Sequence, residues 1–359
     1  MKLGQKKKPT GTFKNHVTEF WEWFPTVARR FYDTIEADRC DDLTDEISEV
    51  AERLLPNLSW AFGPGETGCH AFTVSGEGEI DKQLLAEYWR SRAPRIPNWT
   101  FYASRQPTSP EDLAEMSIHI NDQDSVNAAD LMFKTKVDEE KEVVDIVAWH
   151  PAFADVPEQN QFQILFLFLD EALGEFGTQT WLGEVEIEPF ENAENARSLI
   201  SIPKFIEQMN NYYKWEKQPP LEAYTVYEVP HQNQHPRGDT IVGSSCIPHV
   251  IFEYIENEGM LEVNSLAGTG AEFAYIAIES SVFPEGQQMD VRANIEEALN
   301  ETLVKNLCGR TLGGASGVNE SYIDLLLLDG ENSRQLVMKT LDDLQLEGRS
   351  RLIKIDTSI

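Results

Sequence analysis

Hydrophobic and polar positions follow two different periods in the C-terminal part of the chain. Mainly apolar runs typical of strands cover Phe273 to Ile278, Tyr322 to Leu328 and 352–355. A further strand, over 309–312, is expected as the hairpin partner of Tyr322 to Leu328. Two segments between them place mainly apolar residues at helical spacing: Ile295, Ala298, Leu299, Leu303 and Leu307 in the first, and Leu336, Val337, Leu341 and Leu344, with Thr340, in the second. The pattern therefore predicts the order strand, helix, strand, strand, helix, strand.

This order is that of a ferredoxin-like βαββαβ unit. Its central hairpin is expected to turn at the glycine-rich residues 313–317. Residues Leu325 to Leu328 are apolar at every position, which indicates that both faces of the sheet are covered. The helices of the unit cover one face. We expect the other face to meet the N-terminal part of the chain, or a second copy of the protein in a homodimer.

The N-terminal part mixes helix and strand patterns in the same way. Aromatic residues three or four positions apart, among them Phe20 and Phe24, predict a helix from Phe13 to Ala37 that Pro25 bends or restarts. Further helices are predicted over 42–55, 80–92 and 159–176, and strands over 58–62, 70–74, 99–104, 117–120, 131–136, 143–149 and 181–187. Two of these strands, over 99–104 and 181–187, follow a helix and begin with a tryptophan. One interpretation of this repeated order is a diverged internal duplication.

The predicted fold class is α+β with two domains, because 359 residues is long for a single core. The pattern loosens between 190 and 222, where a short amphipathic helix from Ile202 to Tyr213 precedes the sequence KQPP. We expect a disordered basic tail over 1–12, an N-terminal αβ domain over 13–190, a linker with a short helix over 191–222, and a C-terminal ferredoxin-like sandwich over 223–359.

Acidic residues dominate the charge of the chain. Sixty-one Asp and Glu against 30 Lys and Arg give a formal net charge of -31, spread along the sequence. Binding to nucleic acid or to an anionic membrane needs a basic surface, so neither is an expected partner. The charge fits two interpretations. It serves solubility alone, or it attracts a basic protein partner.

Targeting patterns and cysteine usage indicate a soluble, cytoplasmic protein. The N-terminal sequence MKLGQKKKPTGT has no apolar segment behind its lysines, so it does not resemble a secretory signal. The longest apolar run, Ile164 to Leu169, is far shorter than the ~20 residues of a membrane span. Four widely spaced cysteines in a chain of this size are typical of a reducing compartment.

Four sequence blocks carry a resemblance to a known family. They are FWEWF (20–24), GCHAFTVSGEGE (68–79), APRIPNWTFYASRQP (93–107) and FLDEALGE (168–175). On these blocks the N-terminal half resembles a family of uncharacterised bacterial proteins of unknown function. The resemblance implies a bacterial, cytoplasmic origin and assigns neither an activity nor catalytic residues.

One cluster of residues has metal-ligand spacing. His231, His235, Cys246 and His249 form an H-x3-H pair and a C-x2-H pair within a short segment, and four such ligands can close a tetrahedral zinc site. The competing interpretation is a polar surface loop with Cys246 buried as a small hydrophobic residue. Structural zinc sites usually contain two or more cysteines, which favours the second interpretation.

Other candidates for catalysis are weaker. The glycine turn lacks the lysine of a phosphate-binding loop, and Cys69 precedes a histidine that points to the opposite side of a strand. Carboxylates are so frequent that proximity alone is weak support for a catalytic pair. The acids considered are Asp170, Glu171 and Glu175 near a helix end, with Glu184 and Glu186 on the next strand.

The sequence therefore favours a non-catalytic binding or interaction protein. Tyr212, Tyr213 and Trp215 are candidate partner-binding aromatics, although the same residues can instead fasten the linker to a core. An acidic protein that recognises a basic partner, as toxin-neutralising immunity proteins do, is the most concrete version. Two alternatives stay open: a metalloprotein or metal-dependent hydrolase centred on the His and Cys cluster, and a small-molecule sensor that uses the ferredoxin-like sheet.

Overall fold

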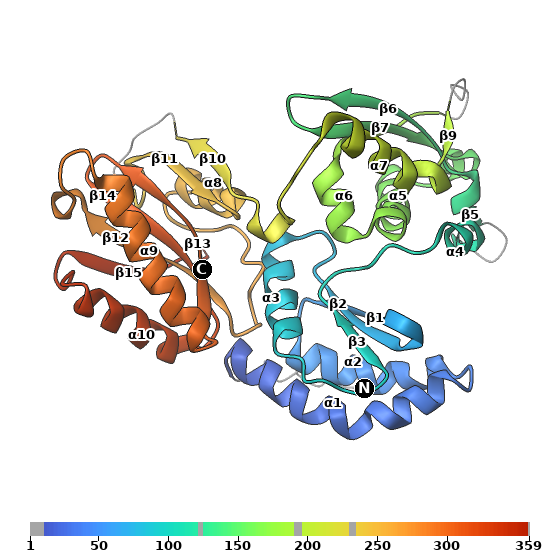
Figure 1. Cartoon of the computed structure of the whole chain (residues 1–359), viewed down its shortest axis with the longest axis horizontal. Coiled ribbons are helices and arrows are strands. Elements are labelled where there is room, and N and C mark those ends of the chain that lie inside the picture. Colours follow the sequence, from blue (N-terminus) through green and yellow to red (C-terminus); the bar gives the residue numbers. More distant parts are fainter. Residues whose placement is uncertain (1–10, 121–124, 190–195, 230–234, 358–359) are drawn as a thin grey trace, which may run out of the picture.

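The protein has an α+β fold in which three groups of elements follow one another along the chain (Figure 1). The computed structural model describes residues 11–120, 125–189, 196–229 and 235–357. The predicted basic tail lies almost wholly outside these residues, as does His231. No helix in the described part of the chain is long and apolar enough to cross a membrane.

The first group contains three helices and a small mixed sheet. Its elements are α1 (Phe13–Ile35), α2 (Thr44–Leu54), β1 (Ser59–Pro64), β2 (His70–Ser75), α3 (Ile80–Ser91) and β3 (Trp99–Tyr102). β2 pairs antiparallel with β1 and parallel with β3. Helix α1 continues past Pro25 without a restart, and one face of it buries the aromatic residues that predicted it. Trp21 of this helix stacks on Trp89 of α3 with ring centroids 4.8 Å apart.

The second group surrounds a four-stranded sheet of order β8-β7-β6-β9 and a separate two-stranded ladder, β4-β5. Its elements are α4 (Pro110–Glu115), β4 (Ser117–His119), β5 (Ser125–Asn127), β6 (Met132–Asp138), β7 (Val143–Trp149), α5 (Glu158–Leu173), α6 (Glu175–Trp181), β8 (Leu182–Ile187), β9 (Arg197–Ser198) and α7 (Ile202–Tyr213). The single helix predicted over 159–176 is divided at Gly174, whose φ of 75° and ψ of 152° are outside the helical region and are readily adopted only by glycine.

The third group is a six-stranded antiparallel sheet of order β10-β11-β13-β14-β12-β15. Its elements are β10 (Thr225–Glu228), β11 (Thr240–Ser245), α8 (Pro248–Glu256), β12 (Glu272–Glu279), α9 (Gln288–Lys305), β13 (Gly309–Gly317), β14 (Glu320–Leu327), α10 (Gly330–Asp343) and β15 (Ser350–Lys354). From β12 onward the elements follow the order predicted from the sequence. Strands β10 and β11 extend the sheet beside β13.

Both faces of this sheet are buried, as the apolar run of β14 predicts. Leu325 and Leu327 pack with α9 and α10, whereas Leu326 and Leu328 belong to a core shared with the first group. Residues from 13–103 and from 221–355 form that shared core, so the second face is covered by α8 and by elements of the same chain. This face was expected to meet either the N-terminal part of the chain or a second copy of the protein, and in the structure it meets the N-terminal part.

Residues 113–215 form a core of their own. The helix predicted for the linker, α7, contributes Ile202, Phe205 and Ile206 to this core. The division of the chain into domains at 190 and 222 stays a prediction.

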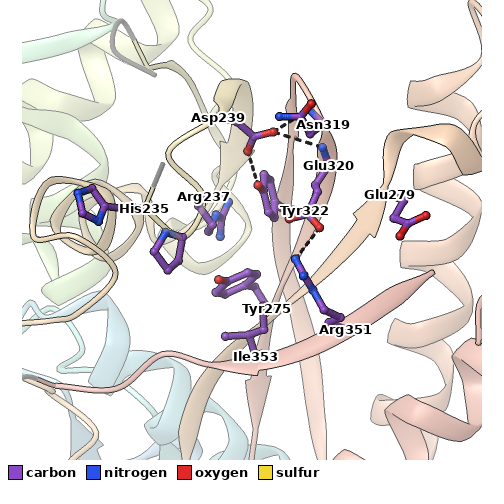
Figure 2. A pocket seen from close by; sticks show the side chains of 11 residues that line it. His235, Arg237, Asp239, Tyr275, Glu279, Asn319, Glu320, Tyr322, Arg351 and Ile353 are labelled. Carbon is purple, nitrogen blue, oxygen red and sulfur yellow. Dashed lines mark hydrogen bonds and ion pairs between the residues drawn. The ribbon is translucent and has the colours of Figure 1, made fainter. Parts of the chain in front are cut away.

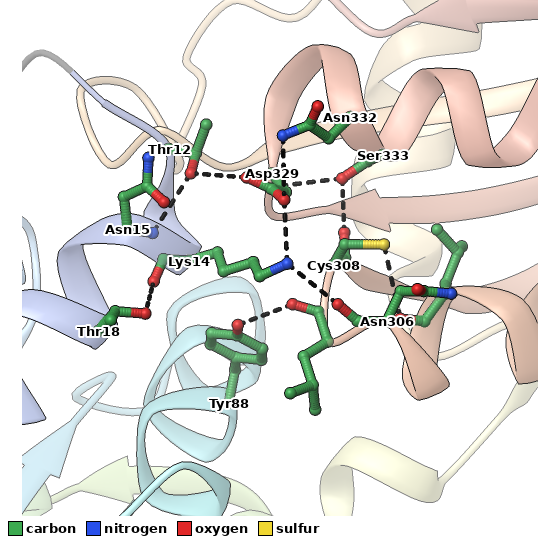
Figure 3. A network of polar contacts seen from close by, with 12 residues as sticks. Thr12, Lys14, Asn15, Thr18, Tyr88, Asn306, Cys308, Asp329, Asn332 and Ser333 are labelled. Carbon is green, nitrogen blue, oxygen red and sulfur yellow. Dashed lines mark hydrogen bonds and ion pairs between the residues drawn. The ribbon is translucent and has the colours of Figure 1, made fainter.

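Polar contacts fasten the start of α1 to the sheet (Figure 3). The Lys14 backbone N–H donates to the Leu328 carbonyl at 2.9 Å, and the Lys14 ammonium donates to the Asp329 carboxylate at 3.0 Å. The Tyr88 hydroxyl of α3 donates to the Leu307 carbonyl at 2.8 Å. The first and third groups are therefore joined by hydrogen bonds as well as by the shared core.

The predicted glycine turn is wrong, because residues 313–317 belong to β13. Gly313 pairs with Ser245 on one side and with Asp324 on the other. Its φ is 131°, and a Cβ atom there would lie 2.1 Å from the Ser244 carbonyl oxygen. The glycines allow β11 to approach β13 closely, a requirement that the local pattern does not reveal.

Candidate functional site

A pocket of about 800 Å³ opens at one end of the six-stranded sheet (Figure 2). We call it the sheet-end pocket. It lies on the face of the sheet opposite α9 and α10. Its walls come from the segment before β11, from the ends of three strands and from the turn between β13 and β14: His235, Pro236, Arg237, Asp239, Tyr275, Glu279, Asn319, Glu320, Tyr322, Arg351 and Ile353.

The alternation of side chains along two neighbouring strands brings the tyrosines of the pocket together. In the β12/β14 register Ala277 lies opposite Tyr322, and Tyr275 lies opposite Asp324. Tyr275 and Tyr322 therefore project from the same face, with ring centroids 5.9 Å apart and the rings close to perpendicular. The intervening Ile276 and Ile323 face the helices instead.

A buried arginine lies against both tyrosine rings. The guanidinium carbon of Arg237 lies 5.2 Å from the centre of the Tyr275 ring and 4.8 Å from that of Tyr322. The guanidinium forms an ion pair with Asp324, and the two side chains are 0% and 1% exposed. Burial raises the pKa of the Asp324 carboxyl, and the charge of Arg237 opposes this shift. Because an unpaired charge at this depth is unfavourable, each partner requires the other.

Asp239 fixes the turn at the mouth of the pocket. Its carboxylate accepts hydrogen bonds from the backbone N–H groups of Asn319 at 2.7 Å and Glu320 at 3.3 Å, and also from the Tyr322 hydroxyl. Burial and the neighbouring Asp239 carboxylate raise the pKa of Tyr322, so this phenol stays protonated at neutral pH. Asp239 thus holds the β13–β14 turn against the segment that carries Arg237.

The rim of the pocket carries more negative than positive charge. Glu320 pairs with Arg351 at 2.5 Å, whereas Glu279 is exposed at the end of β12. The lining residues include three carboxylates, Asp239, Glu279 and Glu320, and two guanidiniums, Arg237 and Arg351. The charge of Arg237 is balanced by the buried Asp324. A pocket with aromatic walls and a surplus of carboxylates suits an ammonium or guanidinium group.

The residues of the predicted zinc cluster line different pockets. His235 lies at the sheet-end pocket, 3.6 Å from Glu258, while His231 is outside the described residues. Cys246 lines a second pocket and His249 a third. Within the described residues, no group of three or more His, Cys, Asp and Glu side chains is placed to hold a metal ion.

Cys246 and His249 have local partners of their own. Cys246 is buried in the shared core, and burial raises the pKa of its thiol to about 11. The Nε2 atom of His249 lies 2.8 Å from Asp81 Oδ1, and the Ser265 hydroxyl donates to the other oxygen of Asp81 at 2.6 Å. The hydrogen bond with Asp81 raises the pKa of His249.

The three candidate partner-binding aromatics differ in exposure. Trp215 is buried in the 113–215 core, and the Tyr213 ring stacks on it with centroids 5.2 Å apart. Tyr212 is 76% exposed. Trp215 and Tyr213 therefore fasten this segment to the core. Partner binding through Tyr212 stays a prediction.

The weaker catalytic candidates also have local contacts. Glu175 is fully buried and accepts hydrogen bonds from the side chains of Ser75 and Gln83 and from the backbone N–H groups of Gly78 and Arg105. This carboxylate joins the loop after β2 to the start of α6. Burial raises the pKa of the nearby Asp170 to about 6.

Sequence reasoning did not find the sheet-end pocket. A signal was present in the sequence YIDLLLL (322–328), where Asp324 interrupts a strand that is otherwise apolar. A carboxylate in a buried strand requires a buried partner, and Arg237 is that partner. No family model, curated protein or solved structure matches the chain.

Proposed function

We propose that this chain is a non-catalytic interaction protein that recognises a basic protein partner through the sheet-end pocket. The observation that carries the proposal is the surplus of carboxylates around tyrosine walls in a chain of net charge -31. Complementary charge speeds the encounter of two proteins and selects against partners of like charge. A lysine or arginine of the partner would enter the pocket between Glu279 and Glu320.

We propose further that residues 223–359 form a ferredoxin-like domain extended by two strands. Its support is the strand order β15-β12-β14-β13, in which the first strand lies between the fourth and the third. A cytoplasmic location is part of the same proposal. It is supported by the four cysteines, all of which are free thiols.

Binding of a basic probe tests the proposal. The probe is a fluorescent peptide of alternating arginine and glycine, and binding is followed by anisotropy. The double variant Glu279→Gln, Glu320→Gln should weaken binding about tenfold, which corresponds to about 1.4 kcal/mol. A matched control is Glu297→Gln, Glu301→Gln, which removes the same charge from α9 on the opposite face of the sheet and should change affinity less than about twofold.

Salt dependence separates electrostatic from apolar recognition. Raising the ionic strength from about 0.05 M to 0.3 M shortens the screening length, so affinity for the probe should fall. Binding that does not depend on salt, or an equal loss in the pocket variant and the control variant, would exclude recognition by the pocket carboxylates.

A second candidate is the small-molecule sensor, which the size of the pocket favours. Ligand pockets usually enclose about 300–1,000 Å³ and present aromatic walls with a few polar groups. A sensor predicts that a small amine or guanidinium compound raises the melting temperature, and that Glu279→Gln reduces this shift. Stabilisation by the small compound without binding of the peptide would favour the sensor over the interaction protein.

A further inference from the structure

Strand β10 forms an open edge of the six-stranded sheet. It stands at the end of the strand order and pairs with β11. Within the described residues, no strand pairs with its other side. The side chain of Val226 at this edge is 71% exposed, and Thr225 and Glu228 are exposed as well. An open edge of this kind is a template for an added strand.

The backbone groups that point outward can be assigned from the hydrogen bonds of the sheet. The Val229 N–H donates to the Ile241 carbonyl at 3.0 Å, so the backbone N–H and C=O of Val229 point toward β11. Because the N–H and C=O of one residue point the same way and alternate along an antiparallel strand, Thr225 and Tyr227 also face β11. Val226 and Glu228 therefore direct their N–H and C=O groups away from the sheet.

A second pocket, of about 640 Å³, lies at the start of this strand. We call it the β10 pocket. It is lined by Tyr224 and Thr225 on one side, by Gln179 and Thr180 of α6 on the other, and by Lys217. Thr225, at the start of β10, lies opposite Ser245, the last residue of β11. The segment 235–239, which lines the sheet-end pocket, leads into the first residue of β11, Thr240. The two pockets thus lie toward opposite ends of β10.

The β10 pocket holds a cation with spare hydrogen-bonding capacity. The Lys217 ammonium donates to the carbonyls of Lys141 at 3.1 Å and Thr180 at 3.2 Å, and an ammonium has three N–H donors. Burial lowers its pKa. The charge of the nearby Glu142 opposes this lowering. The charge of Arg310 opposes the rise that burial gives the pKa of Tyr224, and the carboxylate that lines the pocket, Glu222, is exposed. A carboxylate ligand would accept a hydrogen bond from the third N–H of Lys217, since its two hydrogen bonds within the chain go to carbonyls.

We propose that β10 and the β10 pocket together bind the extended C-terminal segment of a partner protein. The segment adds an antiparallel strand to β10 through the N–H and C=O groups of Val226 and Glu228. A strand antiparallel to β10 runs in the direction of β11, so its C-terminal end arrives at Thr225, beside the pocket. Lys217 then binds the terminal carboxylate. This site is separate from the sheet-end pocket and does not depend on the function proposed for that pocket.

Peptides with free and blocked C-termini test the proposal. Random heptapeptides displayed with a free C-terminus are selected on the full chain, and the selected sequences are synthesised as free acids and as amides. The free acids should bind, the amides should bind at least about tenfold more weakly, and binding should slow hydrogen exchange of the Val226 and Glu228 amides. Failure to enrich any peptide, or equal affinity for acid and amide, overturns the proposal.

Matched variants test the two halves of the site. Val226→Pro removes an outward N–H but leaves the bonds to β11, and Val226→Thr keeps that N–H. Lys217→Met removes the carboxylate ligand, and Lys214→Met removes an exposed lysine nearby. Val226→Pro and Lys217→Met should each weaken binding of the free acid about tenfold, whereas the two control variants should change it less than about twofold. Unchanged binding in either test variant overturns the proposal, and Glu279→Gln, Glu320→Gln should leave this binding unchanged.

Discussion

The ion pair between Arg237 and Asp324 supports the sheet-end pocket, so removing one of its charges should destabilise the protein. Both side chains are at most 1% exposed, and no solvent is available to replace the lost charge. Asp324→Asn changes the charge with almost no change in volume. The arginine would keep its contacts with the two tyrosine rings but lose its counter-ion.

The expected magnitude follows from the burial of the pair. Breaking a fully buried ion pair by removing one partner costs about 3–5 kcal/mol. The amide oxygen of asparagine still accepts a hydrogen bond, which reduces the loss to about 2–4 kcal/mol. With a denaturant dependence of about 3 kcal/mol per molar urea, the unfolding midpoint should fall by about 1 M.

Urea unfolding followed by tryptophan fluorescence measures this loss. The control is Asp33→Asn, whose partner Arg29 is exposed and whose effect should stay within about 0.5 kcal/mol. Replacing both charges, in Arg237→Met with Asp324→Leu, should recover most of the stability, because apolar residues tolerate burial. A loss below about 1 kcal/mol in Asp324→Asn would refute the reasoning that the pair is held as two buried charges.

Three further predictions concern other parts of the chain. The hydrogen bond with Asp81 raises the pKa of His249, so the pair stabilises the folded protein fully below about pH 6.5, and this stabilisation is lost as pH rises through the folded-state pKa. Asp81→Asn should therefore lower the thermal unfolding temperature more at pH 5.5 than at pH 8.5. An equal loss at both pH values would contradict the pairing. Gly313→Ala should cost more than about 2 kcal/mol in urea unfolding because its Cβ would meet the Ser244 carbonyl, whereas Gly63→Ala, which meets nothing within 4 Å, should cost little. Trp215→Ala should cost about 3–5 kcal/mol if the ring packs in the core, and Tyr212→Ala should be near neutral in the same assay; the reverse order would contradict the assignment of Trp215 to the core.

The local pattern of the sequence predicts the order of the elements from β12 onward, whereas β11 and α8 were not predicted. The first strand of the βαββαβ unit was expected from Phe273 to Ile278, and β12 extends from Glu272 to Glu279. Its side chains alternate between two buried cores, so the apolar signal is continuous and strong. The coverage of both sheet faces also follows from the sequence, because an exposed face does not tolerate four consecutive leucines.

The sheet-end pocket could not be predicted in the same way. Its residues extend from His235 to Ile353 and meet only because β12, β14 and β15 are neighbours in the sheet. The glycines of β13 were misassigned for a related reason, because the close approach of β11 that requires them comes from a distant segment. Metal-ligand spacing was a poor guide here, since His235, Cys246 and His249 share a short segment but line separate pockets.

Hydrogen exchange with and without the arginine–glycine peptide tests the central claim most directly. Binding at the sheet-end pocket predicts slower exchange of backbone amides in residues 235–239, 275–279 and 319–322, and loss of this protection in the variant Glu279→Gln, Glu320→Gln. Protection confined to other segments, or protection that persists in the variant, would contradict the claim that the pocket carboxylates recognise a basic partner.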